Sequence, residues 1–171
     1  MLTKRSDSNI VYLEVKHYRL WRSLKEKVEG CDTVKTVNPQ TSKEVIKYGY
    51  GFDTVGGRAT KLEKYDTEKK YSKRYFGFKL HLADGADSYV IDMPYASQIL
   101  RRFLRLARNI DWTLPVAITV FKGKKKEGAG MEDTGIWFQQ RGETVKPYYT
   151  KEEMHGMPEA TYDKLENTWD F

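Results

Sequence analysis

Apolar and polar residues alternate along most of this chain, and the alternation predicts a protein built mainly of short β-strands. In residues 73–82, Phe76, Phe78, Leu80 and Leu82 fall on one parity, and mostly polar side chains fall on the other. Successive side chains of a strand point to opposite faces, so this run predicts a strand with one buried face. Similar patterns predict strands at residues 44–55, 58–66, 88–93, 115–121 and 135–140, with a last extended piece at 143–149.

Turn signals and one helical pattern separate these strands. Gly56 and Gly57 are typical of a two-residue hairpin turn. Residues 10–28 fit the spacing of a helix and that of a strand, so the pattern leaves this segment open. One helix is predicted over residues 95–108, where apolar side chains recur at helical spacing: Ile99, Leu100, Phe103, Leu104 and Ala107.

The order of these elements predicts a mainly β fold, a β-barrel with one helix. A helix between the third and fourth of five strands is typical of the OB-fold, a five-stranded Greek-key barrel. We therefore expect an N-terminal extension in residues 1–42, an OB-fold nucleic-acid-binding domain in residues 43–149 and an acidic C-terminal tail in residues 150–171. Ligands of this fold bind on the face of strands two and three and at two loops, of which the second here is the lysine-rich segment 122–130.

The uneven distribution of charge points to a polyanionic partner. The 171 residues carry a net charge of +6, but residues 150–171 hold two lysines against six carboxylates, a net −4. The remaining 149 residues therefore carry +10, and many of their basic side chains adjoin aromatic ones. Cations suit phosphates and flat rings suit unstacked bases, so this composition favours single-stranded nucleic acid. The alternative interpretation of the same composition is a basic, soluble protein that has no nucleic-acid partner.

Candidate contacts follow from side chains placed away from the expected core. Outward aromatic residues predict base stacking, and basic residues predict phosphate contacts, although a single exposed lysine or histidine is usually an ordinary surface residue. For Phe121, capping of the barrel end is an equal alternative. The candidate nucleic-acid contacts are Arg58, Lys61, Lys64, Lys73, Arg74, Tyr75, Lys79, His81, Phe121, Lys124, Lys125, Lys126, Trp137 and Gln139.

Several function classes find no support in the residues. There is no apolar run of about 20 residues and no apolar segment near Met1, so we expect neither a membrane protein nor a secreted one, and the single Cys31 suits a reducing cytoplasm. The glycine-rich loop lacks the Lys-Ser/Thr ending of a nucleotide-binding P-loop. His17, His81 and His155 have no zinc-ligand spacing. We expect no catalysis, no cofactor and no metal.

Three stretches of the chain resemble OB-fold single-stranded DNA-binding proteins of tailed bacteriophages. Together they cover most of residues 47–160: KYGYGFDTVGGRATKLEKYDTEKKYSKRYFGFKLHLADG, PYASQILRRFLRLARNIDWTLPVAITVFKGK and GIWFQQRGETVKPYYTKEEMHGMPEA. The resemblance implies protection of single-stranded DNA during phage replication, recombination or repair, in the cytoplasm of the host. It also implies that the terminal Trp169, Asp170 and Phe171 recruit replication proteins.

Two other functions are compatible with the same sequence. A metal-dependent nuclease could use carboxylates such as Asp84, Asp87 and Asp92, because nucleases hold Mg²⁺ near the phosphate with acidic groups. The first two flank Gly85, however, where aspartate also favours a turn. A structural phage protein could use an OB barrel to bind another protein, since fold does not fix function.

Overall fold

The computed structural model describes residues 9–38, 41–68, 74–95, 97–123, 134–150, 161–163 and 168–170. These residues form a mainly β structure with one α-helix, as predicted, and no helix among them is long and apolar enough to span a membrane. The elements are β1 (Asn9–Lys16), β2 (Arg19–Leu24), β3 (Asp32–Val37), β4 (Glu44–Phe52), β5 (Thr54–Glu68), β6 (Arg74–Asp84), β7 (Asp87–Pro94), α1 (Gln98–Leu106), the 3-10 helix η1 (Ala107–Asn109), β8 (Pro115–Lys122), β9 (Thr134–Gln140), β10 (Glu143–Thr144), β11 (Thr161–Asp163) and β12 (Thr168–Asp170).

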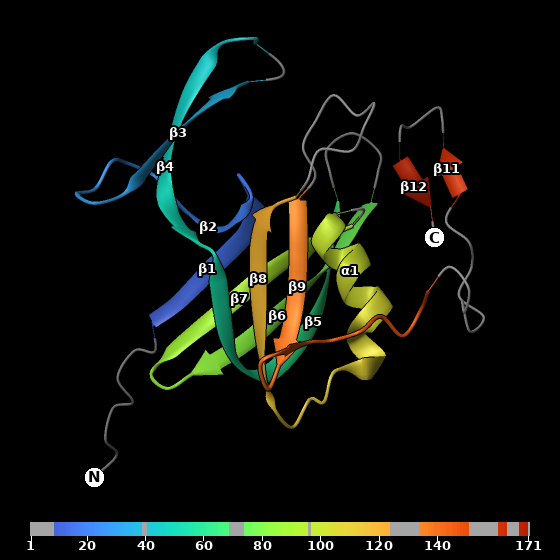
Figure 1. The fold of residues 1–171 in the computed structure, drawn as a ribbon. Coiled ribbons are helices and arrows are strands. Elements are labelled where there is room, and N and C mark those ends of the chain that lie inside the picture. The colour runs from blue at the N-terminus through green and yellow to red at the C-terminus, as the bar shows by residue number, and fades with distance from the viewer. Residues whose placement is uncertain are drawn as a thin grey trace.

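Ten strands form one open sheet, in the order β10-β9-β8-β5-β6-β7-β1-β2-β4-β3 (Figure 1). The expected closed barrel is not formed, because β9 does not pair with β7. Instead β1 occupies the free edge of β7 in parallel register, from Asn9 opposite Asp87 to Leu13 opposite Ile91. The helix α1 contacts both β7 and β9.

The core lies between the inner face of this curled sheet and α1. In β8, Val116, Ile118 and Val120 are buried, and in β9 Ile136 and Phe138 are buried, as the alternation predicted. The helix begins after Ser97, whose hydroxyl accepts a hydrogen bond from the Leu100 backbone N–H. Its buried stripe differs from the prediction, because Leu104 is 37% exposed, Leu106 is buried, and Ala107 is only partly buried and lies in η1. The remaining buried helix residues are Ile99, Leu100 and Phe103.

The predicted hairpin turn at Gly56 and Gly57 is wrong. The chain passes from β4 to β5 through Asp53 alone, and both glycines lie inside β5, opposite Ala117 and Val116 of β8. A Cβ atom at Gly57 would meet the backbone of Ala83. This glycine therefore permits close approach of another strand, which a turn signal in the sequence does not distinguish from a turn.

Within residues 1–42, expected as an N-terminal extension, residues 9–37 supply three strands of the same sheet. The undecided segment 10–28 forms β1 and β2, and Leu13 and Leu20 from these strands are buried in the common core. Beyond the core, β2, β4 and β3 continue as a projection from the body (Figure 1). We call this projection, residues 19–52, the arm.

Trp21 anchors the base of the arm. Its side chain is 2% exposed and lies against Gly49 of the paired strand β4. A Cβ atom at Gly49 would overlap the Trp21 ring and the backbone carbonyl of Arg22. Gly49 therefore permits the close approach of a neighbouring strand and its side chain.

We predict that Gly49→Ala destabilises the protein by about 1–3 kcal/mol, the usual cost of overpacking a tight site. The matched control is Gly56→Ala, where a Cβ atom would meet its nearest neighbours at ordinary distances of 3.5–3.6 Å. Urea unfolding of both variants measures the difference. Equal stability of the two variants would contradict the packing of Trp21 against Gly49.

His17 lies in the tight turn between β1 and β2 with a left-handed backbone, φ 52°, followed by Tyr18 at φ 60°. Its ring packs edge-on against Trp21, with 5.4 Å between the ring centroids. Burial lowers the pKa of His17, and the positive charges of Lys16 and Lys47 lower it further, with Glu14 opposing them. The folded protein therefore disfavours the protonated imidazole.

This shift predicts a loss of stability in mild acid. A histidine whose pKa is lower in the folded state is protonated first in the unfolded chain, so the free energy of unfolding decreases as pH falls below about 6.5. The variant His17→Asn keeps a residue that tolerates the left-handed turn. We expect it to lose this part of the pH dependence in denaturant titrations between pH 7.5 and pH 5.5. An unchanged pH profile would contradict the prediction.

Candidate nucleic-acid interface

The sheet surface that points away from the core carries most of the predicted nucleic-acid contacts that lie within the described residues. On this outer face, strand register sets Phe121 opposite Gly135, Thr119 opposite Trp137 and Ala117 opposite Gln139. The face continues from Thr119 to Thr54 of β5. Farther along β5 it includes Arg58, Lys61 and Glu63, opposite Ala83, His81 and Lys79 of β6 respectively.

Phe121 and Trp137 form a pair of adjacent rings on the outer face of β8 and β9, which we call the aromatic platform. Their centroids are 4.5 Å apart at an interplanar angle of 55°, and Trp137 is 44% exposed. The Phe121 ring lies across Gly135, where a Cβ atom would overlap it. The prediction that Trp137 points outward is confirmed, and Phe121 lies beside it. The strand alternation explains both orientations, because Val120, Ile136 and Phe138 are buried.

Hydroxyl and amide groups bind the strands together beside the platform. The Thr54 and Thr119 hydroxyls are hydrogen-bonded at 2.9 Å, and the Thr119 hydroxyl donates to Gln139 Oε1 at 3.2 Å. These bonds link β5, β8 and β9 across their outer face. The platform therefore stands on three connected strands, which limits its motion relative to the core.

A second group of predicted residues gathers on β5 and β6. Lys61 Nζ donates to Glu63 Oε2 at 2.9 Å, and His81 Nε2 lies 3.3 Å from the same oxygen. Hydrogen bonding and charge attraction from Lys61 lower the pKa of Glu63, with His81 contributing less, so this carboxylate is ionised at neutral pH. Its negative charge partly offsets the two basic groups beside it.

Tyr65 belongs to the same group and was not anticipated from the sequence. Its hydroxyl donates to Asp92 Oδ1 at 2.7 Å, and Lys79 Nζ lies 5.1 Å from the centre of its ring. Burial raises the pKa of Tyr65, and the bond to Asp92 raises it further, so the phenol remains a neutral donor. The signal that could have revealed it is Gly77, directly opposite, over which the Tyr65 ring lies.

Other predicted residues fall elsewhere. Lys64 is on the opposite face of β5 from Lys61, and its Nζ lies 5.4 Å from the centre of the Phe76 ring. Arg58 is exposed on the outer face. The backbones of Arg74 and Tyr75 belong to β6, and those of Trp169 and Asp170 to β12, but their side chains lie outside the described structure. Lys73, Lys124, Lys125, Lys126 and Phe171 also lie outside the described residues.

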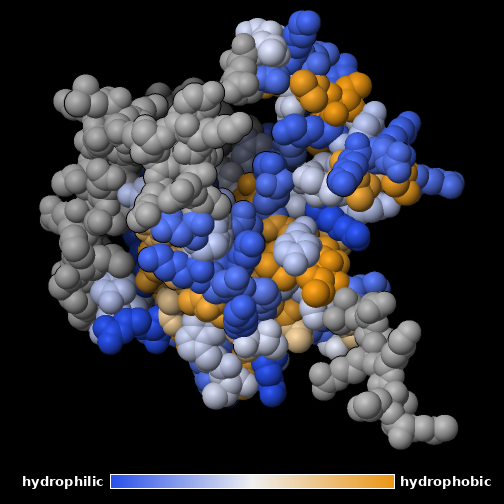
Figure 2. Space-filling model, turned by 180° about the vertical axis from the view of Figure 1, so that it is seen from behind, coloured by the Kyte–Doolittle hydropathy of each residue, from blue (hydrophilic) through white to orange (hydrophobic). Residues whose placement is uncertain are grey.

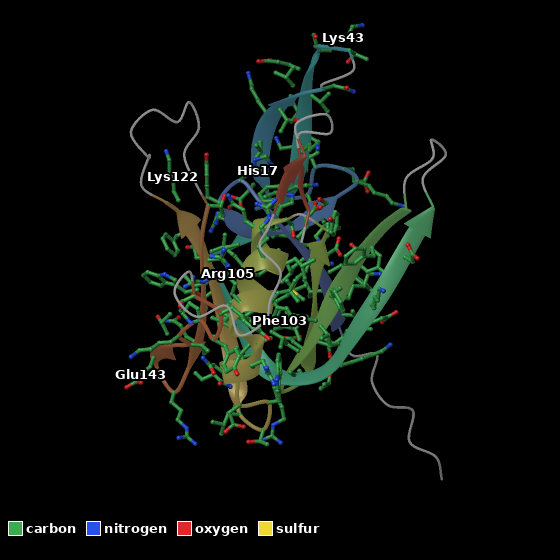
Figure 3. All side chains as sticks on the ribbon, turned by 90° about the vertical axis from the view of Figure 1, so that its right-hand side faces the viewer. His17, Lys43, Phe103, Arg105, Lys122 and Glu143 are labelled. Carbon is green, nitrogen blue, oxygen red and sulfur yellow. The ribbon has the colours of Figure 1, made fainter. Side chains whose placement is uncertain are left out.

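The structure thus brings the predicted contacts together in two groups rather than one. The platform with Thr119 and Gln139 occupies the β8–β9 side, and Lys61, Lys79 and His81 occupy the β5–β6 side. Figure 3 shows these two pairs of strands on either side of α1. Strand register makes the outer face continuous from β8 through β5 to β6. Because the sheet curls (Figure 1), the two groups at the ends of this face point in different directions.

An apolar cleft between β5 and α1 was not predicted. It has a volume of about 570 Å³, and Leu62, Leu104 and Trp112 line it with exposed fractions of 37–47%. At its rim, Arg108 stacks on Tyr148 with 4.8 Å between guanidinium carbon and ring centre. The Tyr148 and Tyr149 backbone N–H groups donate to the Arg105 carbonyl. The helix therefore holds the segment after β10 against the body, and Arg108 contributes to this contact.

The carboxylates considered for a nuclease do not gather at one point. Asp84 and Asp87 face each other beside the β6–β7 turn, where Gly85 has a left-handed φ of 59°. Asp92 lies farther along β7, opposite Lys79, and accepts the Tyr65 hydroxyl. Within the described ranges, no group of three or more His, Cys, Asp or Glu side chains could hold a metal ion.

Comparison of the chain with protein-family models, with curated protein sequences and with solved structures finds no match.

Proposed function

We propose that this protein binds single-stranded DNA with little sequence preference and protects it, without catalysis, during phage DNA replication, recombination or repair. The observation that carries the proposal is the aromatic platform of Phe121 and Trp137. A large exposed ring costs free energy in water unless a ligand covers it, and every base has a flat face that can stack on it. Such stacking needs no particular base, which explains binding without sequence preference.

We further propose that strands β5 to β9 are related to the OB-fold. In its favour are the strand order β9-β8-β5-β6-β7 and the position of α1 between β7 and β8. These match a five-stranded Greek-key barrel whose closing contact between the third and fifth strands is absent. By their place in the chain, residues 69–73 between β5 and β6 and residues 123–133 between β8 and β9 would correspond to the two ligand-binding segments of that fold. The second contains Lys124, Lys125 and Lys126.

Basic residues supply the phosphate contacts in this proposal. Arg58, Lys61 and Lys79 lie on the outer face, and residues 1–149 carry a net charge of +10. Contacts to phosphates release condensed counterions, so affinity should fall as salt increases. The acidic tail ending in Trp169, Asp170 and Phe171 would recruit replication proteins.

A protein-binding function is the second candidate, and the apolar cleft beside Leu62, Leu104 and Trp112 favours it. Exposed apolar clefts suit side chains of a partner protein. The two candidates use different surfaces, because the cleft lies between β5 and α1 whereas the platform lies on β8 and β9. Substitution of one tryptophan at each surface therefore separates them.

We predict that Trp137→Ala weakens binding to single-stranded DNA about five- to a hundredfold, since stacking is worth about 1–3 kcal/mol per base. The matched control is Trp112→Ala, which removes a ring of similar exposure, 40% against 44%, from the apolar cleft. Fluorescence anisotropy with a labelled oligonucleotide measures both. The slope of affinity against salt should not change, because no cation is removed. Equal losses in the two variants would contradict a role for the platform.

Replacing Lys124, Lys125 and Lys126 together by alanine should change the salt dependence of DNA binding, which Trp137→Ala leaves unchanged. If each lysine contacts one phosphate, the slope of log affinity against log salt becomes shallower by about 2, at about 0.7 per contact. The control is Lys16→Ala, since the Lys16 ammonium is already paired with Glu14 at 2.6 Å. A triple variant with the wild-type slope would place the phosphate contacts elsewhere.

A further inference from the structure

The arm has two faces, and strand register identifies which residues lie on each. Leu20 is fully buried in the core and lies opposite Phe52, which packs against the core. Because side chains alternate, the residues that follow on this same side are Arg22 opposite Tyr50, and Leu24 opposite Tyr48. The side continues on β3 and β4 with Lys35 opposite Ile46. We call it the inner face of the arm.

The opposite side of the arm is already occupied near its base by contacts within the protein. Trp21 is buried there, and Arg19 Nε donates to Asp53 Oδ1 at 2.8 Å. Arg19 Nη1 also lies 3.5 Å from Asp32 Oδ2, and the Ser23 hydroxyl donates to Glu14 Oε1 at 2.9 Å. Arg19 and Ser23 on this side are therefore already engaged with carboxylates of the protein itself.

The inner face of the arm differs, because its basic and aromatic side chains are accessible to a ligand. Arg22 is exposed, and its side chain makes no hydrogen bond or ion pair with any described residue. Lys35 Nζ lies 3.8 Å from Glu44 Oε2, with both side chains about 70% exposed. An exposed pair at this distance contributes little, so a phosphate can replace the carboxylate. Tyr48 and Tyr50 are half-buried, so parts of both side chains remain accessible.

The tip of the arm has two features that binding of a ligand would stabilise. Toward its tip only β3 and β4 remain paired, and a two-stranded ribbon is marginally stable by itself in water. Exposed apolar side chains lie on this ribbon, with Val37 at 62%, Val45 at 37% and Ile46 at 49%. Figure 2 shows apolar residues among hydrophilic ones on the arm, at the upper right of that view.

The arm stands at the end of the body where β8 and the β5–β6 pair end. The arm rises above the body, and its tip bends back over it (Figure 1). In the side view, the arm stands above and between the end of β8 at Lys122 and the end of the β5–β6 pair (Figure 3). A strand of nucleic acid on the platform reaches the inner face of the arm by passing over the end of β8, because the platform lies on the outer face of that strand.

From these observations we propose that the inner face of the arm, through Arg22, Tyr48 and Tyr50, is a second contact surface for single-stranded DNA. The proposal rests on the proposed function and extends the bound length of DNA beyond the platform. Charge favours this ligand over an apolar protein segment, because residues 19–52 hold seven basic side chains against four acidic ones. Two tyrosines beside an arginine that pairs with no described residue offer stacking and phosphate contacts together.

Oligonucleotide length provides the test, because only a long strand reaches both surfaces. Full-length protein is titrated with labelled oligo(dT) of about 6 and about 18 nucleotides, which bracket the usual site sizes of this kind of domain. Tyr50→Ala, Tyr48→Ala and Arg22→Ala should bind the short oligonucleotide as the wild type does. Each tyrosine variant should bind the long one about five- to a hundredfold more weakly.

Matched controls are Tyr12→Ala, a tyrosine 62% exposed on β1, and Lys47→Ala, on the opposite side of the arm ribbon. Both should bind the two lengths as the wild type does. Arm variants that match the wild type at 18 nucleotides would overturn the arm proposal, while a loss in Trp137→Ala would leave the proposed function standing. Equal losses at both lengths would also overturn it. Failure of the wild type to bind either length would overturn the proposed function itself.

A second measurement does not depend on the variants folding. An 18-nucleotide strand containing iodouracil is cross-linked to the wild-type protein, and the labelled peptides are identified by mass spectrometry. Labelling at Tyr48 or Tyr50 is expected, in addition to labelling at Trp137 or Phe121. Labelling at the platform without any on the arm would overturn the arm proposal.

Discussion

Burial of one apolar core between the curled sheet and α1 is the constraint on which the rest of this structure depends. Phe103 of the helix is buried in this core, and its ring centroid lies 6.0 Å from those of Phe138 and Trp112. Each large side chain buried here is worth about 1.5–3 kcal/mol relative to exposure. Since β9 does not pair with β7, the helix holds the two sides of the sheet in place. Alternation then determines which side chains face outward, the aromatic platform among them.

Local features of the fold could be predicted from the sequence because they depend on neighbouring residues. The buried parities of β8 and β9 follow from Val116, Ile118, Val120, Ile136 and Phe138, and the outward position of Trp137 follows from the same pattern. The helix was placed correctly within a few residues, because its apolar spacing and its cap are local signals. For these elements, the sequence was sufficient to place Trp137 and Phe121 on the outward parity of their strands, but the contact between their rings is seen only in the structure.

Features that depend on distant pairing could not be predicted. Nothing near Asn9–Leu13 indicates a parallel partner in β7, so the open sheet replaced the expected barrel. The irregularity in register between Ala59 and Lys61 changes the parity of β5, so that Arg58 and Lys61 share the outer face whereas Lys64 does not. The apolar cleft and the Tyr65–Asp92 bond likewise join segments far apart in the chain. Such contacts depend on tertiary structure, and local sequence patterns give little indication of them.

The central claim is that exposed rings on a basic body select unpaired bases. Stacking on Phe121 and Trp137 requires a free base face, which a duplex does not offer along its length, whereas phosphate contacts alone do not discriminate between the two. The most direct measurement is therefore a competition at moderate salt, in which unlabelled single strands and the duplex of the same sequence displace a labelled single strand from the full-length protein. The account predicts that the single strand competes at a much lower concentration than the duplex. Equal or stronger competition by the duplex would contradict it.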